Sequence, residues 1–124
     1  MNRPLVLIVE DHPLMRETLV NALQLEGMDT LIADGGDKAL DLLCVSAPDL
    51  VILDVELPGA LSGLDVLLAI RRNPRLASTV VVLHTSEPGV ANMAEAKAAD
   101  LVLVKPADLD QLLLLMQRLL KVPA

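Results

Sequence analysis

The stretch that decides the fold is DLVILDVELPG, residues 49–59, in which an apolar run leads directly into Asp54. The run is bounded by Asp49 on one side and, beyond Asp54, by a Leu-Pro-Gly turn. A short apolar run between turn residues is typical of a buried β-strand. We therefore expect this strand to end at Asp54 and to place the carboxylate of that residue at the rim of a sheet.

Two further apolar runs also end in charged residues. The run LVLIV at residues 5–9 is followed by Glu10 and Asp11. The run LVLV at residues 101–104 is followed by Lys105. Three acids and one base at the ends of three strands indicate a functional site at the carboxyl ends of those strands, because chance turn residues would not account for all four.

Strand-like and helix-like segments alternate along the chain. Helical patterns lie between and after the strands; the fourth, roughly 89–98, is rich in alanine and weakly patterned, and the fifth starts at Asp108. This alternation predicts an α/β fold with parallel strands joined by right-handed crossovers, as one domain over residues 1–124. In such a sheet the ligand site lies beyond the carboxyl ends of the strands. The predicted strands fall near residues 4–9, 29–33, 49–54, 79–84 and 101–104.

The composition excludes several classes of protein. The chain has 124 residues, a net charge of −7 and no Phe, Tyr or Trp. We therefore expect no nucleic-acid binding, which needs a basic face and often aromatic stacking. No apolar run approaches the ~18 residues of a membrane span, so we expect no membrane insertion. Cys44 is the only cysteine, which excludes an internal disulfide and fits a reducing, cytoplasmic location.

The residue types at the predicted rim suit phosphoryl chemistry. If the strands that lead to Asp11 and Asp54 are neighbours, the two carboxylates converge and repel each other. Mg²⁺ would relieve this repulsion, because it prefers oxygen ligands and needs only one or two carboxylates. An aspartate beside Mg²⁺ can attack phosphorus and form an aspartyl phosphate. Lys105 could neutralise another phosphoryl oxygen, and the hydroxyl of Thr85 could donate a hydrogen bond to the third.

Several short motifs occur in a fixed order along the chain. As an ordered set they resemble the receiver domain of bacterial two-component response regulators, over essentially the whole chain. The resemblance implies a flavodoxin-like, doubly wound sheet of five parallel strands in the order 2-1-3-4-5, with five helices. The motifs are VEDHP at 9–13, Asp54 with its Leu-Pro-Gly turn, Ser62-Gly63-Leu64, Thr85-Ser86, and ADLVLVKP at 99–106.

The resemblance also implies roles in phosphoryl transfer. Asp54 would accept a phosphoryl group from a phosphohistidine on a sensor histidine kinase or a histidine phosphotransfer protein. Thr85 and Lys105 would bind the phosphoryl oxygens. The domain would catalyse its own phosphorylation and dephosphorylation, without acting on a separate substrate.

The same resemblance implies a Mg²⁺ site on the loops that follow the strands. Asp11, Asp54 and the backbone carbonyl of Glu56 would bind the ion. Glu10 would take part through a water molecule. Mg²⁺ is therefore the expected cofactor.

One departure from the family's pattern bears on the expected output. Val102 stands where the family usually has Tyr or Phe, so an output route that couples a threonine shift to rotation of an aromatic ring cannot operate as such. We expect residues 89–121 to contact an effector or a second copy of the domain. The cognate kinase and the regulated process cannot be read from the sequence.

Two different functions share some of these features. A degenerate receiver binds partners without phosphorylation, and the complete acidic set argues against this function. A haloacid-type phosphatase also uses a nucleophilic aspartate after a strand. That class needs a second aspartate two residues further on, where this chain has Glu56.

Three polar residues near the strand ends could also take part in the chemistry. Ser86 could replace Thr85 as the hydroxyl donor; we favour Thr85 because the family places its hydroxyl residue first. His12 and His84 could be considered as catalytic bases. We expect instead that His12 is exposed in its loop and that His84 packs at a strand end.

Overall fold

The structure is a computed structural model that describes residues 3–106 and 108–121. The described residues form a five-stranded parallel sheet in the order β2-β1-β3-β4-β5, which confirms the implied topology. Each predicted strand agrees with the structure to within one residue at either end. The strands are β1 (Leu5–Val9), β2 (Asp29–Ala33), β3 (Leu50–Asp54), β4 (Val80–Thr85) and β5 (Leu101–Val104).

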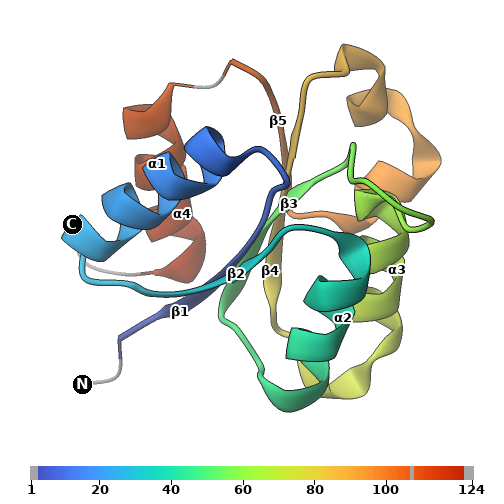
Figure 1. Cartoon of the computed structure of the whole chain (residues 1–124), viewed down its shortest axis with the longest axis horizontal. Helices are drawn as coiled ribbons and strands as arrows, with labels where there is room; N and C mark the ends of the chain where they lie inside the picture. The colour runs from blue at the N-terminus through green and yellow to red at the C-terminus, as the bar shows by residue number, and fades with distance from the viewer. Residues whose placement is uncertain (1–2, 107, 122–124) are drawn as a thin grey trace.

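Four α-helices are present among these residues, and they cover the two faces of the sheet (Figure 1). Helices α1 and α4 lie on one face, whereas α2 and α3 lie on the other. They correspond to the predicted first, fifth, second and third helical segments. Their bounds are α1 (Pro13–Leu25), α2 (Gly36–Val45), α3 (Gly63–Arg72) and α4 (Leu109–Leu120).

The predicted fourth helical segment, roughly 89–98, folds differently from an α-helix. Met93 is extended in its middle, with φ −75° and ψ 141°. The segment buries Val90 and Ala96, which is too little to form the apolar stripe that holds an α-helix on a sheet. The expectation of five α-helices is corrected to four in the described part of the chain. The 3₁₀-helices are η1 (Pro74–Leu76), η2 (Pro88–Asn92) and η3 (Ala94–Ala98).

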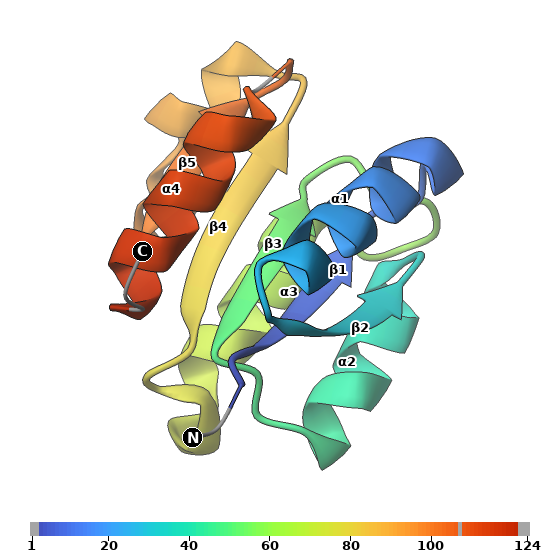
Figure 2. The same ribbon diagram turned by 90° about the vertical axis from the view of Figure 1, so that its left-hand side faces the viewer.

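Side chains alternate along the strands between two apolar cores. In β3, Val51 and Leu53 face α2 and α3, whereas Leu50 and Ile52 face α1 and α4. Figure 2 shows α1 and α4 on the near face of the sheet. Every residue of β3 is buried. Because burial of one such side chain contributes roughly 1.5–3 kcal/mol, the two cores hold this strand in a single register.

The register brings the carboxyl ends of the strands to one rim. Glu10 follows β1 and Lys105 follows β5, so both lie at the same edge of the sheet as Asp54. The residue pairs that define the alignment of the strands are Val9–Leu53, Asp54–His84 and Thr85–Val104.

Among the described residues, no helix has the length and apolar character needed to cross a bilayer.

Local signals fix the starts of the helices near this rim. His12 caps α1, with Pro13 in its first turn. Ser62 and Asp65 form a reciprocal capping box at the start of α3. Asp108 caps α4 and accepts hydrogen bonds from two amides of its first turn.

Candidate functional site

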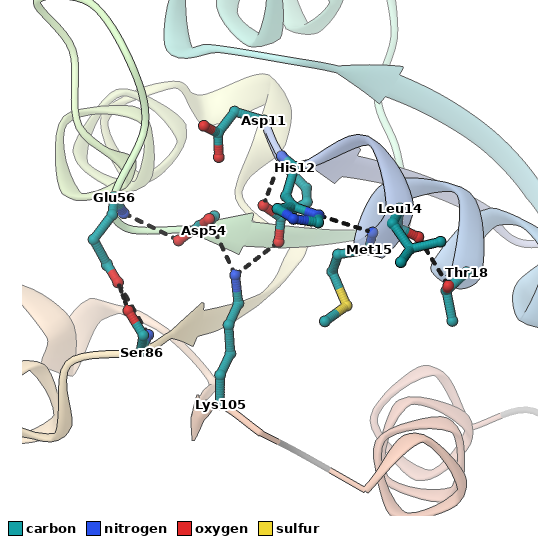
Figure 3. A pocket seen from close by; sticks show the side chains of 10 residues that line it. Asp11, His12, Leu14, Met15, Thr18, Asp54, Glu56, Ser86 and Lys105 are labelled. Carbon is teal, nitrogen blue, oxygen red and sulfur yellow. Dashed lines mark hydrogen bonds and ion pairs between the residues drawn. The ribbon is translucent and has the colours of Figure 1, made fainter.

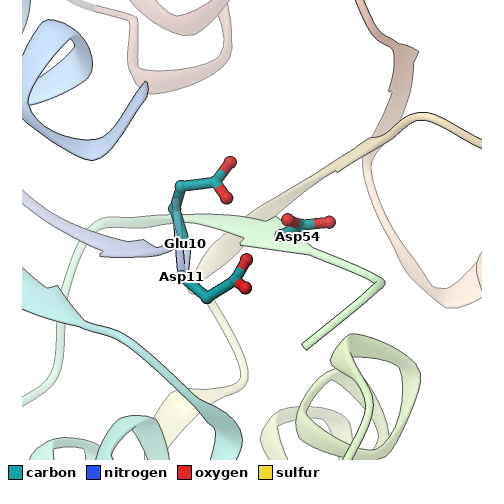
Figure 4. A group of neighbouring side chains, drawn as sticks. All are labelled: Glu10, Asp11 and Asp54. Atoms are coloured by element: carbon teal, nitrogen blue, oxygen red, sulfur yellow. The ribbon is translucent and has the colours of Figure 1, made fainter. Parts of the chain in front are cut away.

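Three carboxylates meet at the rim of the sheet (Figure 4). Glu10 and Asp11 follow β1, Asp54 ends β3, and each offers an oxygen within 4.8 Å of the others. Glu10 and Asp54 are buried, with 2% and 4% of their surface exposed, whereas Asp11 is exposed. The structure therefore brings together the three acids that follow the first and third strands in the sequence.

Lys105 lies between the two buried acids. Its Nζ is 2.8 Å from Oε1 of Glu10 and 3.2 Å from Oδ2 of Asp54. Burial acts to lower the pKa of Lys105, but the hydrogen bonds and charges of the two carboxylates raise this pKa above its usual range. The lysine is therefore a fixed positive charge inside the acidic cluster.

The two buried carboxyl groups titrate differently. Burial raises the pKa of Asp54 to about 7, and the neighbouring Glu10 carboxylate acts in the same direction. Burial also acts to raise the pKa of Glu10, but hydrogen bonds from Lys105 and from the His12 amide hold this pKa below its ordinary value. Asp54 is thus a carboxyl group poised near neutral pH, where an added cation would favour its ionised form.

The loop between β1 and α1 is held by a residue that sequence reasoning missed. Nη1 of Arg16 donates to the backbone carbonyl of Glu10 at 2.9 Å and to that of Asp11 at 3.4 Å. The amide of His12 donates to Oε2 of Glu10 at 3.2 Å. No sequence pattern indicates this role, because Arg16 binds backbone carbonyls, which every residue has.

The loop after β3 is held close to Asp54. The amide of Glu56 donates to Oδ1 of Asp54 at 3.0 Å, and the amide of Gly63 donates to the carbonyl of Val55 at 2.9 Å. A Cβ atom on Gly63 would collide with the backbone carbonyl of Asp54. Glycine at this position therefore lets α3 begin directly against the backbone that carries the site.

The hydroxyl of Thr85, which we expected to bind a phosphoryl oxygen, is paired with Glu56. Oγ1 of Thr85 donates to Oε2 of Glu56 at 2.7 Å. Ser86 donates to Oε1 of Glu56 from its hydroxyl at 2.7 Å and from its amide at 3.0 Å. Burial acts to raise the pKa of Glu56, but these hydrogen bonds hold it below its ordinary value. The structure thus connects Thr85 to the loop after β3 and not to the acid–lysine cluster.

A cleft of about 480 Å³ opens onto the cluster (Figure 3). One wall is formed by the ionisable groups and the other by the first turns of α1. A small charged group could therefore reach Asp54 while a larger partner contacts the helix. The lining residues are Glu10, Asp11, His12, Leu14, Met15, Thr18, Asp54, Glu56, Ser86 and Lys105.

The three carboxylates fit a small divalent cation. Mg²⁺ binds oxygen at about 2.0–2.1 Å, so ligands on opposite sides of the ion lie roughly 4.2 Å apart. The oxygens of Glu10, Asp11 and Asp54 lie within 4.8 Å of one another, which is close to that spacing. The donor set therefore suits Mg²⁺ in charge, chemistry and size.

The sequence model of the response regulator receiver domain matches residues 6–117 of the chain. This chain belongs to the response regulator receiver family. The receiver shares 34% identity with the response regulator TrrA of Thermotoga maritima, solved in complex with Mg²⁺-BeF, over 94% of this chain and 98% of that one, with a TM-score of 0.86. The chemotaxis response regulator CheY4 of Vibrio cholerae has 29% identity, 95% and 99% coverage, and a TM-score of 0.87.

Curated relatives of this receiver are longer proteins. Regulatory protein AtoC of Escherichia coli K12 is 36% identical over 119 residues, which is 94% of this chain and 25% of AtoC. The DNA-binding response regulator MtrA of Mycolicibacterium smegmatis is 34% identical over 109 residues, which is 86% of this chain and 47% of MtrA. This receiver therefore spans less than half the length of these two relatives.

The two histidines lie where the sequence placed them. His12 is exposed, and its Nδ1 accepts a hydrogen bond from the Met15 amide at 3.4 Å. His84 is buried in β4, with 3% of its surface exposed. Both expectations about their positions are confirmed.

Proposed function

We propose that this receiver is a phosphoacceptor switch in two-component signalling and that Asp54 takes the phosphoryl group. The observation that carries the proposal is the setting of Asp54. Its carboxyl group is buried at the rim of the sheet, faces the cleft, and is hydrogen-bonded to Lys105. A nucleophilic carboxylate needs such a positive group, because charge builds up on the transferred phosphoryl oxygens.

The transfer would use the residues of the cluster in defined roles. An oxygen of Asp54 forms a bond to phosphorus while the phosphorus–nitrogen bond of a phosphohistidine breaks with its electron pair on nitrogen, and the departing imidazole takes up a proton from water. Lys105, 3.2 Å from Oδ2 of Asp54, is placed to donate to a phosphoryl oxygen. Thr85 would supply a second contact after it leaves Glu56.

Mg²⁺ would supply the counter-charge that keeps the Asp54 carboxylate ionised and neutralises a phosphoryl oxygen. Asp11, Asp54 and the backbone carbonyl of Glu56 would bind the ion, and Glu10 would contribute through water. The exposed position of Asp11 suits a ligand that also leaves room for several waters.

The Asp11→Asn substitution is expected to weaken Mg²⁺ binding by about tenfold, because it removes one of the few negative ligands of a weakly chelated ion. Isothermal titration calorimetry measures the affinity directly. Asp41→Asn is the matched control, because Asp41 is an exposed acid on α2. Equal Mg²⁺ affinity in the two variants would contradict the assignment of Asp11 to the metal site.

Incubation of the wild-type receiver with acetyl phosphate and Mg²⁺ is expected to add the mass of one phosphoryl group. Intact mass spectrometry counts the added groups, and peptide mapping is expected to locate the modification at Asp54. Chelation of the metal with EDTA should prevent labelling. A receiver that stays unmodified with Mg²⁺ present would contradict the phosphoacceptor function and favour a degenerate receiver.

The wider setting of the switch follows from the family. The phosphodonor would be a sensor histidine kinase or a histidine phosphotransfer protein, in the cytoplasm. Leu14 and Met15 give the cleft an apolar wall suited to contact with the donor protein.

The signal produced by phosphorylation would pass through residues 89–121 to an effector or to a second copy of the domain. Val102, half-buried against the core that includes Val90 and Ala96, would transmit at most a small movement.

A further inference from the structure

The Glu56 carboxylate joins the loop after β3 to the end of β4. It accepts hydrogen bonds from the Thr85 hydroxyl and from both the amide and the hydroxyl of Ser86. Figure 3 shows the Glu56 side chain directed away from Asp54 and towards Ser86. The Thr85 oxygen also accepts a hydrogen bond from the amide of Glu87 at 3.0 Å. Both the donor and an acceptor function of this buried hydroxyl are therefore in use.

A hydroxyl group has one proton and donates it to one acceptor at a time. Alternation along the strands places Asp54 in the row of Ile52, and Thr85 in the row of Leu83 on the other face of the sheet. A contact between Thr85 and a phosphoryl group on Asp54 therefore requires that the hydroxyl leave Glu56. The hydrogen bond to Glu56 opposes that movement.

We propose that the Glu56 side chain is a positioning residue that holds Thr85 in the unphosphorylated receiver and competes with the phosphoryl group for the hydroxyl proton. The inference rests on the proposed function of Asp54 and Thr85. Ser86 keeps the carboxylate in place through its own two hydrogen bonds when Thr85 leaves. Glu56 then remains available to take Thr85 back after the phosphoryl group is lost. Its carboxylate thus sets the balance between the resting and the phosphorylated form.

The test uses beryllofluoride with saturating Mg²⁺ as the probe, with affinity measured by NMR titration. The Glu56→Ala substitution keeps the backbone carbonyl and removes the competing acceptor. We expect it to bind beryllofluoride about 5- to 10-fold more tightly than wild type, because a hydrogen bond to a charged acceptor no longer has to be broken. Because Glu56 is exposed, the variant is expected to fold, and a cooperative thermal transition checks this.

Loss of a negative charge also favours anion binding, so the Thr85→Val background serves as the matched control. Valine has the shape of threonine without the hydroxyl. We expect Glu56→Ala to change the affinity by less than about twofold in that background, because only the charge effect remains. An equal gain in both backgrounds would show that Glu56 acts through its charge alone and would overturn the proposal.

Failure of the two proposals can be told apart. If the wild-type receiver does not bind beryllofluoride with Mg²⁺, the proposed function itself is wrong. If wild type binds and the gain does not depend on Thr85, only the positioning role of Glu56 is wrong. A second readout is the amide chemical shift of Glu87, which donates to the Thr85 hydroxyl and does not contact Glu56. In free Glu56→Ala this shift is expected to move towards its beryllofluoride-bound value, because Thr85 is no longer held by the carboxylate.

Discussion

Asp54→Asn is expected to abolish phosphoryl incorporation from acetyl phosphate, whereas the wild-type receiver takes up one group. The amide of asparagine has nearly the shape of the carboxylate but is not a nucleophile towards phosphorus. Its oxygen can still accept the hydrogen bond that the Glu56 amide gives to Asp54. The expected loss is therefore chemical and not structural. Intact mass spectrometry after a fixed incubation with Mg²⁺ gives the labelled fraction of both proteins.

The free energy of unfolding of Asp54→Asn is the control that the unlabelled variant is still folded. Unfolded Asp54 loses its proton near its ordinary pKa of 3.8, whereas the folded protein holds the pKa at about 7. Between these values the folded state binds more protons, so its stability is full at low pH and falls as pH rises through 7. Without metal at pH 8, Asp54→Asn is therefore expected to be more stable than wild type, on the order of 1–2 kcal/mol. Labelling of this stable variant at the wild-type rate would show that the phosphoacceptor lies elsewhere.

The position of the site could be predicted because it depends on strand ends. Apolar runs that stop at Asp54 and just before Glu10 and Lys105 show where the chain leaves the core. A parallel sheet then brings those ends to one rim. The alternation of strands and helices alone does not determine which strands are neighbours. The strand order came from the motifs that resemble receiver domains, and the structure has the same order.

The partners of each side chain could not be predicted, because they depend on distances between loops. Lys105 was expected to hold a phosphoryl oxygen, and in the structure it pairs with Glu10 and Asp54. Thr85 was expected at the phosphoryl site, and it donates to Glu56. Both residues thus have a partner within the protein that sequence patterns do not reveal. The 3₁₀ geometry of η2 and η3 was missed for a similar reason, since it depends on the small contact that this segment makes with the sheet.

His84→Leu is expected to stabilise the receiver by about 1–3 kcal/mol at pH 8, although it replaces a residue next to the site. The imidazole is 3% exposed, and neither ring nitrogen has a hydrogen-bond partner among the described residues. His84 pairs in register with Asp54 and Leu103 and shares a face with Val82, which belongs to the apolar core under α1 and α4. Leucine has a similar volume and loses no hydrogen bond to water on burial. Urea denaturation monitored by circular dichroism measures the difference.

The pH dependence of the stability difference distinguishes removal of an unpaired buried imidazole from a simple improvement in packing. Burial, followed by the charge of Lys105, lowers the pKa of His84, while Glu10 and Glu56 act in the other direction. Below about pH 6.5 the imidazole of His84 is protonated in the unfolded chain but stays neutral in the folded protein. The free energy of unfolding of wild type therefore decreases as pH falls below that value and is unaffected by the titration of His84 above it. The advantage of His84→Leu should therefore widen from about pH 8 to about pH 5.5. A destabilised His84→Leu would mean that the ring nitrogens have a partner such as a buried water, and the imidazole would then count as a stabilising part of the core.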